Sequence, residues 1–99
     1  MKCPSYDLFF ETFSNKTRMR IIEALTSGKK SVNELCRITG EEQSKVSHNL
    51  KKLTECRFLD FKREGKKRIY SLNQDTIIPI LKLVEKHVRT YCREACSKK

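Results

Sequence analysis

Residues 43–53 of this chain combine an apolar stripe with a row of short polar side chains. Val46, Leu50 and Leu53 follow at steps of four and three, which is the period of an α-helix. Short side chains that donate and accept hydrogen bonds can be pressed against base edges in a major groove, and lysines beside them can reach phosphates. The alternative is a surface helix that is merely polar. The residues predicted to contact bases are Gln43, Ser44, Ser47 and His48, with Asn49 next to them, and those predicted to contact phosphates are Lys45 and Lys51.

Three cysteines near the two ends of the chain form a second candidate group. Cys92 and Cys96 are four residues apart and would share one face of a final helix. Two thiolates at this spacing can hold one soft metal ion, although zinc usually takes four ligands. If the first and last helices pack together, Cys3 approaches the pair. The three thiols then predict a thiol switch or a site for a thiophilic ion such as Zn(II), Cu(I) or As(III). The alternative is that they bind nothing.

The charge of the chain favours a polyanionic partner. Twenty-two Lys and Arg residues against twelve Asp and Glu give a formal net charge of +10. Nucleic acid is the usual polyanion, although a protein can be merely basic.

A length of 99 residues predicts a single domain, residues 1–99. Because no run is long enough for a membrane span and no secretory signal is evident, we expect a cytoplasmic protein without a membrane partner.

The polar helix follows a second short helix. Ser31 and Glu34 have the spacing of a capping box, which predicts a helix that begins there. Gly40 marks a turn, and the polar helix, residues 43–55, comes next. Two helices joined in this way form a helix-turn-helix, which presents its second helix to the major groove. The buried residues expected in the first of these helices are Val32, Leu35 and Ile38.

Beyond Phe58 the apolar residues alternate with polar ones, which predicts two β-strands. Gly65 lies between the two runs, where a hairpin needs a tight turn. A basic hairpin directly after a helix-turn-helix is a wing. The wing, residues 62–68, is predicted to contact the DNA backbone or the minor groove through Arg63, Lys66, Lys67 and Arg68.

The two ends of the chain predict a contact with a second copy. Residues 5–13 form a short aromatic helix with more apolar surface than it can hide in its own domain. Residues 76–96 form a final helix whose apolar residues step by four and three, as in a coiled coil. Packing within one subunit is the alternative to a homodimer. The predicted interface residues are Phe9, Phe10, Phe13, Ile77, Leu81, Val84, Val88 and Tyr91.

Over nearly its whole length the chain resembles the ArsR/SmtB-type winged-helix repressors. The stretch F-S-N-K-T-R-M-R-I-I is similar to the family's second-helix signature. A D-x-T-R-x-R pattern is matched there by Asn15, Thr17, Arg18 and Arg20, the last three of which form its T-R-x-R part. Residues 32–53 are similar to its helix-turn-helix, and F-K-R-E-G-K-K-R-I-Y-S-L to its wing. The resemblance implies a mostly α fold with a small β-hairpin (α+β): four helices, two strands and a last helix. It also implies a dimer that binds double-stranded DNA.

Four features depart from the family pattern. The family usually has Ser-x-His-Leu in the recognition helix, whereas here Asn49 stands where the His would be, which bears on operator sequence rather than on DNA binding. Cys56-Arg57 replaces an Ala-Gly pair, so this helix must end without glycine. Of the family's arsenical site only Cys36 remains, and its zinc site on the last helix lacks both histidines, with His87 one residue out of place.

These observations predict a sequence-specific DNA-binding regulator, expected to be a homodimeric repressor, with control by a thiol or soft-metal site near the last helix. An effector-independent or chromatin-architectural DNA binder is the first alternative, and a winged-helix protein-interaction module is the second. An enzyme with a small-molecule substrate is not expected, because the sequence has no nucleophile–His constellation and no phosphate-binding glycine loop.

Overall fold

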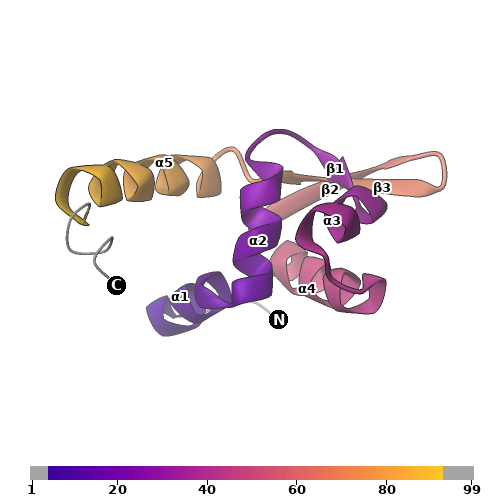
Figure 1. Cartoon of the computed structure of the whole chain (residues 1–99), viewed down its shortest axis with the longest axis horizontal. Coiled ribbons are helices and arrows are strands. Elements are labelled where there is room, and N and C mark those ends of the chain that lie inside the picture. Colours follow the sequence, from indigo (N-terminus) through magenta and orange to yellow (C-terminus); the bar gives the residue numbers. More distant parts are fainter. Residues whose placement is uncertain (1–4, 93–99) are drawn as a thin grey trace.

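The computed structural model describes residues 5–92 (Figure 1). The predicted order of four helices, a hairpin and a last helix is confirmed, with one additional short strand and a π-helical turn at the end. In chain order the elements are α1 (Tyr6–Ser14), α2 (Lys16–Leu25), β1 (Lys30–Ser31), α3 (Val32–Thr39), α4 (Gln43–Glu55), β2 (Leu59–Glu64), β3 (Lys67–Leu72), α5 (Ile77–His87) and η1 (Val88–Cys92).

Side-chain caps begin the first three helices. The backbone N–H of Leu8 donates to Ser5 Oγ at 3.4 Å, and the N–H of Arg18 donates to Asn15 Oδ1 at 3.1 Å. The capping box at α3 is confirmed, since Glu34 N–H donates to Ser31 Oγ and Ser31 N–H donates to the Glu34 carboxylate. Each cap satisfies a backbone donor that the first helical turn leaves free.

The core lies where α2, α3 and α4 pack on the base of the hairpin. Ile38, which the sequence placed in this core, is 55% exposed, so that expectation is wrong. The inward face of α3 runs through Val32, Leu35 and Cys36, and a step of three from Leu35 rotates Ile38 onto the flank. The buried apolar residues are Ile21, Ile22, Leu25, Leu35, Val46, Leu50, Leu53, Phe58, Leu59, Tyr70, Leu72 and Ile77.

The three strands form an antiparallel sheet in the order β1-β3-β2. The sequence did not predict β1, whose residues Lys30 and Ser31 pair with Tyr70 and Ile69 of β3. In the hairpin Glu64 pairs with Lys67, which leaves a two-residue loop. Gly65 has a φ of 65°, the positive value that the first loop residue of a type I′ or II′ turn requires.

Helix α4 ends in a Schellman motif built without glycine. Phe58 N–H donates to Leu53 O at 2.9 Å, and Arg57 N–H donates to Thr54 O at 3.0 Å. Arg57 sits at the position that glycine normally occupies and has a φ of 64°. The departure from Ala-Gly at this point is therefore accommodated by a left-handed arginine.

Asn73 sets the start of α5. Its Nδ2 donates to Arg57 O at 2.8 Å, and its Oδ1 accepts from the backbone N–H groups of Asp75 (2.8 Å) and Thr76 (3.1 Å). Thr76 is the N-cap residue, but its side chain makes no cap hydrogen bond, and the Asn73 side chain instead fixes the turn just before the helix by accepting from Asp75 and Thr76.

Beyond its first turns α5 extends away from the rest of the domain (Figure 1), and the whole molecule is 45 Å long in its greatest dimension. Ile77, predicted to lie at a dimer interface, is instead 2% exposed and completes the core of its own chain, because the first turns of α5 pack on that core, as Ile80 and Leu81 also show. The predicted last helix, 76–96, is regular to His87 and continues as a π-helical turn to Cys92. In residues 5–92 no helix is both long and apolar enough to cross a membrane.

Candidate nucleic-acid interface

The outer face of α4 is exposed and polar. The side chains of Gln43, Ser44, Lys45, Ser47, His48 and Lys51 are all exposed, while the opposite face is buried. Together with the hairpin, α4 lies at the end of the molecule remote from α5 (Figure 1). The helix bounds agree with the predicted range 43–55. A helix of 13 residues with one free polar face has the form that a major groove accepts.

Asn49 does not belong to this face. Its side chain is 6% exposed, its Oδ1 accepts from Arg18 Nε at 3.0 Å, and its Nδ2 donates to Lys45 O at 2.9 Å. Because this amide is buried and both of its polar atoms are hydrogen-bonded within the domain, it is not presented to a base. Asn49 was predicted to lie beside the residues that contact bases, but it is buried. The departure from Ser-x-His-Leu therefore changes a contact inside the domain.

The two arginines of the T-R-x-R pattern lie on α2 and contact α4, and the turn before it, on the side opposite the exposed polar face. Arg18 reaches Asn49 in the middle of the helix, and Arg20 Nη1 lies 3.3 Å from the carboxylate of Glu41 in the turn before it. The same carboxylate lies 3.2 Å from Lys45 Nζ. Lys45 must therefore exchange Glu41 for a phosphate if it contacts DNA, at small cost because exposed ion pairs contribute little. The sequence matched this pattern but did not assign its role.

The wing carries a pair of like charges. Arg63 and Arg68 are directly opposite in the β2–β3 register, and both are exposed, as are Lys66 and Lys67. In residues 5–92 no carboxylate lies within ion-pair distance of either guanidinium. Like charges that face each other across a strand pair destabilise a hairpin, and a bound anion removes that repulsion.

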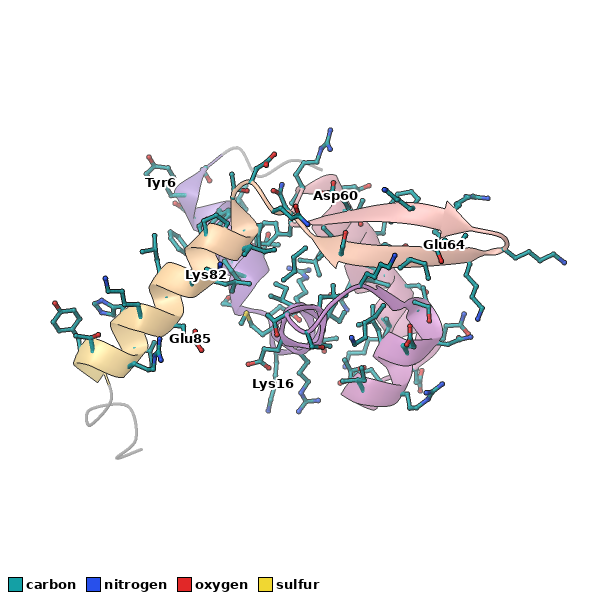
Figure 2. The ribbon with its side chains drawn as sticks, turned by 90° about the horizontal axis from the view of Figure 1, so that it is seen from above. Tyr6, Lys16, Asp60, Glu64, Lys82 and Glu85 are labelled. Atoms are coloured by element: carbon teal, nitrogen blue, oxygen red, sulfur yellow. The ribbon has the colours of Figure 1, made fainter. Side chains whose placement is uncertain are left out.

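Aromatic packing supports one of these arginines. The Arg68 guanidinium lies over the Phe61 ring, 5.0 Å from its centroid, and the Phe61 ring is 5.6 Å from that of Tyr70. Glu64, toward the hairpin tip, forms an ion pair at 3.7 Å with Lys29 of the loop before β1 (Figure 2). The aromatic contacts join β2 to β3 within the wing and fix the position of Arg68, and the exposed Lys29–Glu64 pair adds a weak link to the loop before β1. Phe61 was not among the site residues predicted from the sequence, although a step of two along β2 places it on the same face as Arg63.

A second exposed surface is apolar and lies at the other end of the molecule. On α5 and η1, Leu83 is 65% and Tyr91 is 74% exposed, with Val84 and Val88 about half exposed beside them. On α1, Phe10 is largely exposed, and so is Tyr6, which points into solvent (Figure 2). Phe9 and Phe13, by contrast, pack on Phe58 of their own chain, and Leu81 also packs on the core.

The predicted thiol cluster lies mostly outside the described residues. Cys92 is half-buried at the end of η1, whereas Cys3 and Cys96 fall beyond residues 5–92. Cys36 and Cys56 are half-buried and pack against the core. Within the described part of the chain, no three His, Cys, Asp or Glu residues come together as metal ligands could.

Comparisons with known proteins agree with this geometry. A family model described as bacterial regulatory protein, arsR family, matches residues 15–60, which span α2 to the start of β2. A probable mercury resistance operon repressor of Streptomyces lividans is 27% identical over 75 residues, which cover 76% of this chain and 60% of that protein. The chain thus spans about three fifths of the length of this curated relative.

Two solved structures are similar to the whole fold. The crystal structure of Rv0081 from M. tuberculosis is 30% identical with a TM-score of 0.82, and the match covers 94% of this chain and 97% of that one. The homodimeric winged helix-turn-helix DNA-binding domain Mb0332 from Mycobacterium bovis is 22% identical with a TM-score of 0.75, over 83% and 76% of the two chains. The fold is therefore a winged helix-turn-helix, and the chain belongs to the arsR family of bacterial regulatory proteins, a family of regulators rather than enzymes.

Proposed function

We propose that this protein is a sequence-specific transcriptional repressor that binds double-stranded DNA as a homodimer. The observation that carries the proposal is the exposed polar face of α4, held from behind by α2 and followed directly by a basic wing. Bases are contacted by Gln43, Ser44, Ser47 and His48, and phosphates by Lys45 and Lys51. The repressor role is supported by the similarity to the probable mercury resistance operon repressor of Streptomyces lividans.

The wing supplies the second contact. Arg63 and Arg68 project from one face of the hairpin without an acidic partner among the described residues, so they are available to the backbone or to a minor groove. A narrow minor groove concentrates negative potential and attracts arginine. Lys66 and Lys67 at the tip extend the positive surface toward the phosphates.

A second copy of the chain would cover the apolar surface of α1, α5 and η1. Leu83, Val84, Val88 and Tyr91 form an exposed apolar surface on α5 and η1, beyond the first turns of α5 that pack on the core. The homodimeric Mycobacterium bovis domain has the same fold, which supports this assembly. In such a dimer the two α4 helices must lie about 34 Å apart to enter successive major grooves. A ligand that changes the angle at this interface would change that spacing and release DNA.

The effector, if one acts, is proposed to bind at the thiols. Cys92 lies next to the proposed interface, and Cys3 and Cys96 belong to the predicted cluster outside the described residues. A thiophilic ion or an oxidant acting there would reach the interface directly. The thiol site would be supported if Zn(II), Cu(I), arsenite or mild oxidation released DNA from the wild type but not from Cys92→Ser/Cys96→Ser. Unchanged DNA binding under all four treatments would favour the effector-independent alternative.

The function is tested by selecting DNA sequences from a random pool and comparing two variants on them. Gln43→Ala should change the base preference, because Gln43 opens the face turned to the bases. Lys67→Ala should weaken binding to all sequences by a similar factor and lower the salt dependence by about one unit of slope. Equal losses on selected and random DNA for Gln43→Ala would refute its role. Uniform coating of DNA by the wild type would favour an architectural protein, and absence of DNA binding would favour a protein-interaction module.

A further inference from the structure

Arg18 makes hydrogen bonds to three separate parts of the domain. Its backbone N–H donates to the Asn15 side chain at the junction of α1 and α2. Its Nη1 lies 3.5 Å from the carbonyl of Thr12 in α1, and its Nε donates to Asn49 of α4 at 3.0 Å. One half-buried guanidinium therefore spans from α1 to the recognition helix, and a planar group with several donors in fixed directions is suited to such a bridge.

The acceptor on α4 is held in one orientation. Asn49 Nδ2 donates to Lys45 O one turn earlier in the same helix, so its Oδ1 must face Arg18. Reversing the amide would place NH₂ against a guanidinium donor and lose both bonds. The bridge thus ends on an atom that cannot rotate away without leaving a buried polar group unpaired.

A second contact joins α1 to the far end of α4. The rings of Phe9 and Phe13 pack on Phe58, with centroids 5.0 Å and 5.3 Å away, and Phe58 N–H closes the end of α4. Helix α1 is therefore attached to α4 at its middle by Arg18 and at its end by aromatic packing. On its outer side α1 carries the exposed Phe10 and Tyr6.

We propose that Arg18 is a positioning residue that sets the orientation of α4 relative to α1, and through α1 relative to the partner subunit. The proposal rests on the proposed function, in which α4 reads DNA and α1 lies at the dimer interface. When the Arg18–Asn49 bridge is intact, the two recognition helices keep one mutual angle. When it is broken, each α4 can tilt, and fewer dimers match successive major grooves. Specific binding is then weakened, whereas binding through the wing lysines to any DNA is not.

The test uses Arg18→Met and Asn49→Leu, singly and together, on selected and on random DNA. Each single variant should lose about tenfold in affinity for the selected sequence, within the range usual for coupled sites, and keep the affinity for random DNA. The double variant should bind the selected sequence no more weakly than the single variant with the lower affinity, because both substitutions break the same bridge. Arg18→Lys, which keeps the charge and a donor nitrogen but loses the planar fork, should recover part of the affinity.

Lys16→Met is the matched control, because it removes one positive charge from the same helix at an exposed position that points away from the hairpin (Figure 2). It should leave the affinity for selected DNA within about twofold of wild type, as expected for one distant, screened charge. Additive losses in the double variant, or equal losses on selected and random DNA, would overturn the positioning role.

Hydrogen exchange separates this proposal from the function on which it rests. Arg18→Met and Asn49→Leu should both speed amide exchange in α1 and α4, whereas Lys16→Met should not. If wild type selects no DNA sequence, the proposed function fails, and the exchange experiment still decides whether the bridge couples the two helices. Unchanged exchange in α1 in both bridge variants would overturn the coupling.

Discussion

Replacing Arg57 with glycine should make the protein more stable, because Arg57 ends α4 in a left-handed backbone conformation. Its φ is 64°, and the hydrogen bonds from Phe58 N–H to Leu53 O and from Arg57 N–H to Thr54 O both depend on it. A residue with a Cβ pays about 1–2 kcal/mol in this conformation, whereas glycine adopts it freely. Glycine would keep both bonds and remove the strain.

Two effects offset this gain. Glycine raises the conformational entropy of the unfolded chain, which costs about 0.4–1 kcal/mol. The substitution also removes an ion pair in which Arg57 Nη1 and Asp60 Oδ1 are 4.0 Å apart. Both side chains are largely exposed, so this pair contributes only about 0.3 kcal/mol. The net increase in the free energy of unfolding is about 0.5 kcal/mol, which corresponds to a rise in Tm of about 2–4 °C for a domain of this size.

The assay is urea unfolding followed by circular dichroism, at one fixed protein concentration because dimerisation would make stability concentration-dependent. Arg57→Ala is the matched control, since it loses the same charge and keeps a Cβ at positive φ. It should be no more stable than wild type and less stable than Arg57→Gly by about 0.5–1 kcal/mol. If the glycine variant is no more stable than the alanine variant, the strain assigned to this position is refuted.

Three further predictions concern α5, α3 and the proposed dimer. Asn73→Ala removes one side-chain donor and the acceptor for two N–H groups, so it should lower the free energy of unfolding by about 1–2 kcal/mol in urea, and Asn73→Asp, which keeps the acceptor, should lose less. Hydrogen bonds from the Ser31 backbone N–H, and then from its hydroxyl, lower the pKa of Glu34 below 4.5. The ionised carboxylate therefore stabilises the fold at pH values above its ordinary pKa, and this stabilisation is lost as the pH falls through the lowered pKa. In Glu34→Gln the urea midpoint should fall less steeply on acidification than in wild type. An equally steep fall in both proteins would contradict this. Val84→Asp places a charge on the exposed apolar face and should weaken dimerisation at least about tenfold in sedimentation equilibrium, whereas Lys82→Ala on the same helix should not.

Features that depend on neighbours in the sequence were predictable. The apolar spacing and the turn at Gly40 placed α4 at residues 43–55, and Ser31 with Glu34 marked the start of α3. The glycine between two alternating runs placed the hairpin loop. Helical period, capping and turn chemistry act over a few residues, so a single sequence contains all the information that they need. The exposed polar face of α4 and the basic wing follow from the same local patterns.

Features that depend on contacts between distant residues were decided only by the tertiary structure. From the sequence Asn49 was assigned to the polar face, yet it is buried and accepts a hydrogen bond from Arg18, which lies 31 residues earlier. Ile77 continued the apolar seam of the last helix but is buried by the body of its own domain. The short strand β1 exists because β3 offers it an edge. The sequence by itself thus determined which elements form and which faces are polar. Only packing decided which polar residues remain free for DNA, because burial depends on what lies opposite a side chain in space.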